Sequence, residues 1–316
     1  MTWRTVVVSS NSKLDLRMNY LVVRSAEIRK VHLSEISLLI IESTAVSMTA
    51  MLLCELSRRK IKVIFCDETH NPYGELMAYH GSHNCSSKLR SQIQWSEDIK
   101  GEVWRRIVQE KILKQSLVLA RIDLERSMML QRYAEDVLES DSSNREGHSA
   151  KVYFNTIFGD GFSRKKSCVE NSCLDYGYAV LLSSVNRGIA ALGYSTELGI
   201  FHDNMYNCYN LGSDLMEPLR PLVDRMVLDL NPTVFSTECK RAMAGILNQK
   251  VILDGKMMHL SNAMPIYLKS VTDALENNNS DMLRFCDYEG TCDEVDSLFR
   301  SASQNIGRAE EVCQIS

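Results

Sequence analysis

Hydrophobic residues in the first eighty positions recur with the short period of β-strands. Runs rich in β-branched residues, each bounded by polar turns, predict strands at Thr5–Val8, Leu21–Val23, Ser37–Ile41 and Ile61–Phe65. The alternation from Tyr73 to Tyr79 predicts one more strand. These strands indicate a small N-terminal β-rich domain covering residues 1–80.

One segment of this domain has helical spacing instead. Between Ser43 and Lys60 the apolar residues recur every three or four positions, at Ala45, Met48, Leu52 and Leu56. Ser43 or Thr44 could cap such a helix, because a side-chain oxygen there can accept a free backbone N–H. The segment therefore predicts a single helix packed on the sheet.

The pattern changes after residue 80. Residues 81–88 contain small polar residues with no periodic face and are predicted to be a linker. From there to residue 275, helix-forming residues dominate and predict a larger, all-helical domain. Its later helices are expected at Ala150–Phe158, Cys173–Ala191, about Asp214 to Val227, Thr237–Asn248 and Asn262–Leu275. The predicted fold class is α+β. The helical domain is expected to be followed by an acidic tail of uncertain order, residues 276–316.

Composition places the chain among soluble intracellular proteins. The chain has 316 residues, 45% of them hydrophobic, enough for a sizeable core. Its longest relevant apolar stretch, Ser37–Ile41, is far too short to span a bilayer, and the N-terminus has no signal-peptide pattern. The ten cysteines are dispersed without a Cys-x-x-Cys pair, which favours reduced thiols over disulfides or structural zinc. We expect a cytoplasmic protein with no membrane segment.

The net charge of −4 is unevenly distributed. From Asp273 onward, ten acidic residues stand against three arginines, so the rest of the chain carries a net charge of +3. A modestly basic body is compatible with nucleic-acid binding, although many mildly basic proteins bind none.

Candidate chemistry is concentrated in the predicted helical domain. No Gly-rich phosphate loop and no Gly-x-Ser-x-Gly motif occur, which argues against nucleotide-driven motors, dehydrogenases and serine hydrolases. Asp214 and Glu217 would share one helix face, and with His202 they would suit Mg²⁺ or Mn²⁺. The same Asp-x-x-Glu spacing is also typical of a capping box, and Pro218 favours a helix start there. Both interpretations stand on spacing alone.

Glu146 is equally ambiguous when it is considered alone. It follows a polar break, Ser140–Asn144, and precedes the predicted helix that starts near Ala150. A glutamate at such a place is usually solvated and stabilised by the positive end of the helix dipole.

Four short sequence motifs, in a fixed order along the chain, contain these candidate residues. They are Arg145-Glu146-Gly-x-x-Ala150-x-x-Tyr153-Phe154, Asp175-Tyr176-Gly177-Tyr178-Ala179, Leu198-Gly199-Ile200-Phe201-His202 and Asp214-x-x-Glu217-Pro218-x-Arg220-Pro221. A fifth, Trp104-x-x-Ile107-Val108-x-x-Lys111-Ile112, precedes them. Together they resemble the CRISPR-associated spacer-acquisition integrase family, the universal endonuclease of CRISPR adaptation, in its type II branch. Asp175 departs from the asparagine expected at its position.

The resemblance implies a fold, an activity and a set of site residues. The family has an N-terminal β-rich domain and a C-terminal helical domain. Glu146, His202 and Glu217 match its catalytic metal ligands for Mg²⁺ or Mn²⁺, with Asp214 in or beside the site. The implied reaction joins the 3′-hydroxyl ends of a captured DNA fragment to the CRISPR repeat by transesterification. The implied partners are DNA, a second copy of the chain, a small CRISPR-associated partner dimer and the effector nuclease.

Basic residues supply candidate DNA contacts. The run Arg164-Lys165-Lys166 could bind the phosphate backbone, and so could a set of basic residues spaced along a predicted helix: Arg105, Arg106, Lys111, Lys114 and Arg121. Each of them could equally be a solvated surface residue.

Other readings of the acids remain open. Three alternatives are a general divalent-metal DNA nuclease, a DNA-binding scaffold with a degenerate site, and a carboxylate-pair hydrolase such as a glycosidase.

Overall fold

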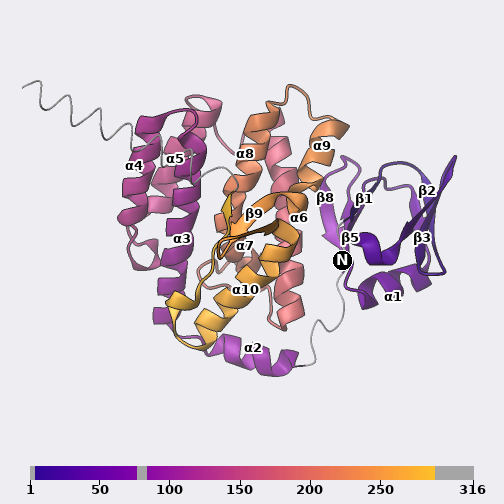
Figure 1. The fold of residues 1–316 in the computed structure, drawn as a ribbon, viewed down its shortest axis with the longest axis horizontal. Coiled ribbons are helices and arrows are strands. Elements are labelled where there is room, and N and C mark those ends of the chain that lie inside the picture. The colour runs from indigo at the N-terminus through magenta and orange to yellow at the C-terminus, as the bar shows by residue number, and fades with distance from the viewer. Residues whose placement is uncertain (1–3, 77–83, 289–316) are drawn as a thin grey trace, which may run out of the picture.

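A computed structural model describes residues 4–76 and 84–288 of the chain. Figure 1 shows a β-rich region at one end and a larger helical region beside it. This arrangement confirms the predicted α+β class, with an N-terminal β-rich region followed by helices.

The N-terminal region contains two four-stranded sheets. One has the order β1-β5-β7-β8 and is parallel except for its last strand; the other has the order β4-β3-β2-β6. Their strands are β1 Arg4–Val8, β2 Ser12–Arg17, β3 Tyr20–Arg24, β4 Ile28–His32, β5 Ile36–Ile41, β6 Val46–Met48, β7 Lys62–Cys66 and β8 Pro72–Glu75. A 3₁₀ turn, η1, covers Leu33–Glu35. The sheets and the helix α1, Ala50–Arg58, enclose an apolar core of their own.

Strand β5 joins this core to the helical region. All six of its residues are buried. Leu39 and Ile41 lie in the N-terminal core, while Leu38 and Ile40 pack into the core of the helical region. A strand covered on both faces reads as a continuous apolar run, which explains the pattern Ser37–Ile41.

The helical region is built around two long helices, α3 Glu97–Leu119 and α6 Val169–Leu192. The other helices are α2 Cys85–Ile93, α4 Leu124–Glu135, α5 Arg145–Phe158, α7 Asn210–Met216, α8 Arg220–Leu230, α9 Thr237–Ala244 and α10 Leu260–Glu276. Short 3₁₀ turns occupy Glu139–Asp141 (η2), Glu217–Leu219 (η3), Ile246–Asn248 (η4) and Ser280–Met282 (η5). In the described part of the chain, no helix is long and apolar enough to cross a membrane.

The sequence predicted that this region would be all-helical, but the structure contains a small sheet there. A three-stranded sheet, β10-β9-β11, is formed by Lys256–His259, Lys250–Leu253 and Asp287–Tyr288. Its hairpin turns at Asp254-Gly255, where both residues have positive φ. An Asp-Gly pair between apolar runs is a strong hairpin signal, so this sheet could have been predicted.

Several predicted boundaries shift in the structure. Helix α1 starts at Ala50, capped by Thr49, because β6 pairs with β2 where the helix had been expected to begin. Helix α2 starts at Cys85, inside the predicted linker, and residues 81–83 lie outside the described residues. Only Pro72–Glu75 of the last predicted strand region is a strand, and Met77–Tyr79 lie outside the described residues.

The first part of the predicted tail belongs to the folded helical region. Cys286 and Tyr288 are buried, and the Tyr288 hydroxyl donates to the carbonyl oxygen of Pro218 at 3.1 Å. The start of the predicted tail therefore connects α10 to β11 through the 3₁₀ turn η5. Residues 289–316 lie outside the described residues.

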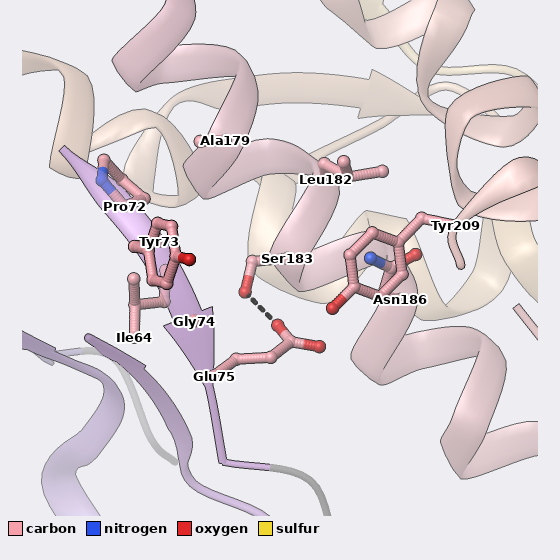
Figure 2. Close-up of a pocket in the computed structure, with 10 residues that line it drawn as sticks. All are labelled: Ile64, Pro72, Tyr73, Gly74, Glu75, Ala179, Leu182, Ser183, Asn186 and Tyr209. Carbon is pink, nitrogen blue, oxygen red and sulfur yellow. Dashed lines mark hydrogen bonds between the residues drawn. The ribbon is translucent and has the colours of Figure 1, made fainter. Parts of the chain in front are cut away.

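A small pocket lies between β8 and α6, where the two regions meet (Figure 2). The Ser183 hydroxyl donates to Glu75 at 2.6 Å, and Glu75 also forms a buried ion pair with Lys62. None of the candidate site residues from the sequence lines this pocket. Its polar groups hold the sheet against α6.

Candidate functional site

Glu146 lies in the first turn of α5, and a preceding acid fixes that turn. The Asp141 carboxylate accepts the backbone N–H groups of Arg145 and Glu146 at 2.8 and 3.0 Å. Asn144, just before the helix, has a left-handed backbone with φ 50° and makes no side-chain cap. Asp141 thus satisfies the free N–H groups of the helix start and sets where Glu146 points.

His202 lies on the loop between α6 and α7, and Asp214 of α7 holds that loop in place. Asp214 is fully buried and accepts the backbone N–H groups of Ile200, Phe201 and His202 at 2.7 to 3.1 Å. Its Oδ1 also lies 2.5 Å from His202 Nδ1. Since both carboxylate oxygens already act as acceptors, Nδ1 donates its proton to Asp214 and leaves Nε2 as the acceptor nitrogen.

The loop is also fixed by close packing. The rings of Trp104 and Phe201 stack with centroids 4.4 Å apart, and Trp104 meets the His202 ring edge to face at 5.7 Å. A Cβ on Gly199 would lie 2.3 Å from the carbonyl oxygen of His202 and 2.8 Å from Asp214 Oδ2. Glycine at this position therefore lets the loop approach Asp214.

Glu217 lies at the start of η3, directly after α7, and is only 3% exposed. Its Oε1 accepts a hydrogen bond from Arg220 Nη1 at 2.7 Å. Its Oε2 forms an ion pair with Nζ of Lys111 at 2.5 Å. The same ammonium donates to Glu146 Oε1 at 2.7 Å. Lys111 thus joins the two glutamates that the sequence had singled out.

The surroundings fix the charge of these groups. Burial raises the pKa of Glu217, but Arg220 and Lys111 outweigh it and hold that pKa at about 2. Burial also lowers the pKa of Lys111, yet Glu217 and Glu146 raise it further and keep the ammonium charged. The hydrogen bond to Asp214 raises the pKa of His202. At neutral pH, Glu217 is therefore an anion in a buried site.

The donor set fits a hard divalent cation. Two glutamates and a histidine supply carboxylate oxygens and an imidazole nitrogen, and Glu217 Oε2 is a buried oxygen that already faces a cation, the Lys111 ammonium. Among residues 4–76 and 84–288, however, no three His, Cys, Asp or Glu side chains converge as a ready metal cage. We attribute this to Lys111, whose ammonium contacts both carboxylates.

Asp214 differs from the other three candidate residues. It lies inside α7, whose first residue is Asn210, and it caps no helix. Glu217 contacts Arg220 and Lys111 rather than the start of α7, so the capping-box interpretation is wrong. Both of its oxygens accept hydrogen bonds from the His202 loop, so in this structure Asp214 supports the imidazole, and its role as a possible metal ligand stays a prediction.

The predicted basic run lies close to this cluster. Arg164 forms hydrogen bonds with Asn171 and Asp175, and its guanidinium lies 5.2 Å from the Tyr178 ring centroid. Asp175, the departure noted in the sequence, is thus an ion-pair partner of Arg164. Lys165 and Lys166 are exposed, and Lys166 donates to the carbonyl oxygen of Gly161 at 2.8 Å.

The basic residues predicted as DNA contacts along α3 form ion pairs within the protein. Lys111 and Lys114 are buried, and Lys114 forms ion pairs with Glu110 and Asp287. Arg105 and Arg106 of α3 pair with Glu102, and Arg121, which follows the helix, pairs with Asp229. The interpretation of Lys111 and Lys114 as surface DNA contacts is therefore wrong. Their helical spacing from Trp104 and Ile107 was the signal that places them on the buried face of α3.

A second buried acid lies behind the cluster. The Tyr178 hydroxyl donates to Asp224 in α8, and Arg220 lies over the Tyr178 ring at 4.3 Å from its centroid. Burial raises the pKa of Asp224 to about 6, although Tyr178 and Arg220 oppose the shift. Sequence reasoning missed this network, because an Asp in an amphipathic helix carries no sign of burial.

Comparisons with known proteins agree with the geometry. Residues 5–238 match the family model described as CRISPR associated protein Cas1. The chain is 36% identical over 233 residues to a CRISPR-associated endonuclease Cas1 from Neisseria meningitidis, covering 73% of this chain and 76% of the relative.

Solved structures share the fold. A casposase bound to integration product has a TM-score of 0.72 at 18% identity, over 88% of this chain and 92% of that chain. A Cas6-RT-Cas1--Cas2 complex has a TM-score of 0.68 at 18% identity over 89% of this chain. The match covers 36% of that longer chain.

Proposed function

The chain belongs to the CRISPR-associated Cas1 family, and from this premise we propose that it is a divalent-metal-dependent DNA endonuclease and strand transferase of CRISPR adaptation. The relative from Neisseria fits the type II branch of that family. The observation that carries the proposal is the pairing of Glu146 with Glu217 through Lys111, together with a His202 imidazole that Asp214 orients and whose pKa Asp214 and both glutamates help to raise.

Each residue of the proposed site has its own role. Glu146, Glu217 and His202 Nε2 would hold Mg²⁺ or Mn²⁺, which when bound neutralises the phosphate and activates an attacking hydroxyl. Asp214 keeps the imidazole in the tautomer that leaves Nε2 free. Arg220 donates a hydrogen bond to Oε1 of Glu217 and holds this side chain in place. The other oxygen, Oε2, faces Lys111, which also contacts Glu146. All three donors are present, which argues against a degenerate scaffold.

The charge of Glu217 narrows its possible roles. A carboxyl that donates a proton in glycoside hydrolysis needs a raised pKa. The two cations beside Glu217 instead hold its pKa at about 2. A permanent anion suits a metal ligand, and in a glycosidase pair Glu217 would be limited to the role of nucleophile or base.

The proposed reaction requires two sites at a set spacing along DNA. We propose that a homodimer, bridged by a small partner dimer of the Cas2 kind, supplies them; one structural neighbour is a complex that contains Cas2. The 3′-hydroxyl of a captured DNA fragment would attack a phosphodiester at the repeat border, and the repeat strand would leave with its own 3′-hydroxyl. With water in place of that 3′-hydroxyl, the same site cleaves DNA.

The test is insertion of labelled donor DNA into a plasmid that carries the repeat. We expect Mn²⁺-dependent insertion of a 3′-hydroxyl donor with the partner present, weak cleavage without it, and loss of both reactions in EDTA. A donor that ends in 3′-phosphate should not be inserted, because the attacking hydroxyl is blocked. Equal insertion of the blocked donor would contradict transesterification, and cleavage without any insertion would favour a general nuclease.

A further inference from the structure

Lys111 is the least expected member of the candidate site. Its side chain is only 8% exposed, and its ammonium lies 2.7 Å from Glu146 Oε1 and 2.5 Å from Glu217 Oε2. Buried lysines are uncommon unless they are paired, and this one is paired with two carboxylates at once. The ammonium therefore occupies the space between the two acids that are proposed to hold the metal.

The cluster is electrically balanced as it stands. Two carboxylates, Glu146 and Glu217, face two cations, Lys111 and Arg220. Adding a divalent cation between the same carboxylates would place it against an ammonium at contact distance, where repulsion in a buried site is strong. One cation has to leave.

The two resident cations differ in how easily they can move. Arg220 is held on Glu217 Oε1 and over the Tyr178 ring, and its guanidinium binds in a fixed planar geometry. Lys111 has a compact ammonium on a flexible stem, and its contacts with Glu146 and Glu217 require no fixed planar arrangement. Lys111 is thus the cation that can withdraw.

We propose that Lys111 is a built-in competitor of the divalent cation: its ammonium pairs Glu146 with Glu217 in the metal-free protein and withdraws when the metal binds. This inference rests on the proposed function, since it takes the two glutamates as metal ligands. Lys111 is a positioning residue in this account. It keeps two buried carboxylates together without metal, and it weakens metal binding by the energy needed to displace it.

The test compares Lys111→Met with a matched variant, Lys114→Met, by Mn²⁺ titration without DNA. Lys114 lies one turn further along α3, is equally buried and pairs with two other acids, Glu110 and Asp287. Lys111→Met should bind Mn²⁺ about tenfold more tightly than the wild type, because the competing charge is gone. Lys114→Met should bind Mn²⁺ as the wild type does.

Thermal unfolding provides a second readout. Without metal, both methionine variants should melt below the wild type, since each removes a buried ammonium that pairs with two carboxylates. Saturating Mn²⁺ should raise the melting temperature of Lys111→Met by more than it raises that of the wild type, while Lys114→Met should show only the wild-type increase. Unchanged or weaker Mn²⁺ binding by Lys111→Met would overturn the inference.

A charge-conserving variant decides the matter if Lys111→Met does not fold. Lys111→Arg should keep the metal-free stability and bind Mn²⁺ more weakly than the wild type, because a guanidinium pairs with carboxylates more firmly. Equal or tighter binding by Lys111→Arg would overturn the inference. Because no DNA is present, failure here is distinct from failure of the proposed function, which donor insertion measures.

Discussion

Glu217 and Asp224 are both buried acids beside the same arginine, yet their pKa values differ. Glu217 lies between Arg220 and Lys111, and its pKa is about 2. Asp224 faces the hydroxyl of Tyr178 instead, and its pKa is about 6. Burial opposes ionisation in both cases, so the difference comes from direct contact with cations. The carboxyl with the low pKa lies where the chemistry is proposed, and the carboxyl behind it takes up a proton once the pH falls to about 6.

The sharpest test of this comparison is activity. Glu217→Gln should lower Mn²⁺-dependent insertion about a thousandfold or more, since a metal supplies several kcal/mol of transition-state stabilisation. Asp224→Asn should change the insertion rate by less than about tenfold, because Asp224 is not a proposed ligand. Circular dichroism melts should show both variants folded. Similar losses of insertion rate in the two variants would mean that both acids affect activity only through the packing of the buried region.

Asp214 is a third buried acid, whose partners are N–H dipoles rather than cations. Asp214→Asn should lower insertion about 10- to 100-fold, the usual effect of losing the support of a ligating histidine. An amide group there would face N–H donors and disturb the His202 tautomer. The exposed neighbour Asp203 offers a control, and Asp203→Asn should retain wild-type rates. Full activity of Asp214→Asn would remove Asp214 from any role at the site.

The raised pKa of Asp224 gives a stability prediction with a definite sign. The folded protein holds the Asp224 proton up to about pH 6, while the unfolded chain releases it near 3.8. The free energy of unfolding should therefore fall, relative to Asp224→Asn, as pH rises from about 4 to about 6, by up to about 3 kcal/mol. Urea unfolding at several pH values would measure this difference. Parallel curves for the two proteins would show that Asp224 is ionised throughout.

The smallest expected effect concerns DNA contacts outside the cluster. Arg164 is engaged with Asp175 and Asn171, so Lys165 and Lys166 are the members of the run free to bind phosphates. Lys165→Gln with Lys166→Gln should reduce the salt dependence of DNA binding by up to roughly 0.9 per lost contact. A pair with the same charge change, Lys30→Gln with Lys256→Gln, serves as control. An unchanged salt slope would leave the run as a solvated loop.

The sequence predicted the order of the two regions because strand and helix periods differ clearly. It missed β9–β11 although Asp254-Gly255 is a hairpin signal, and it placed the start of α1 too early, because Ala45 and Met48 fit both periods. Glu146, His202 and Glu217 were singled out only by ordered motifs. Lys111 was read as a surface residue, because a lysine in a charged helix usually is one. Its spacing from Trp104 and Ile107 indicated the buried face of α3, but its two carboxylate partners come from α5 and η3 and depend on the tertiary packing.

The central claim is that Glu146, His202 and Glu217 hold one divalent cation at the position that Lys111 now occupies. A crystal structure of the protein soaked in Mn²⁺, with an anomalous difference map, measures this directly. The account predicts a manganese peak in coordination contact with both glutamates and with His202 Nε2, and a Lys111 ammonium moved away from Glu217. Manganese bound elsewhere, or Lys111 still between the two carboxylates at saturating Mn²⁺, would contradict it.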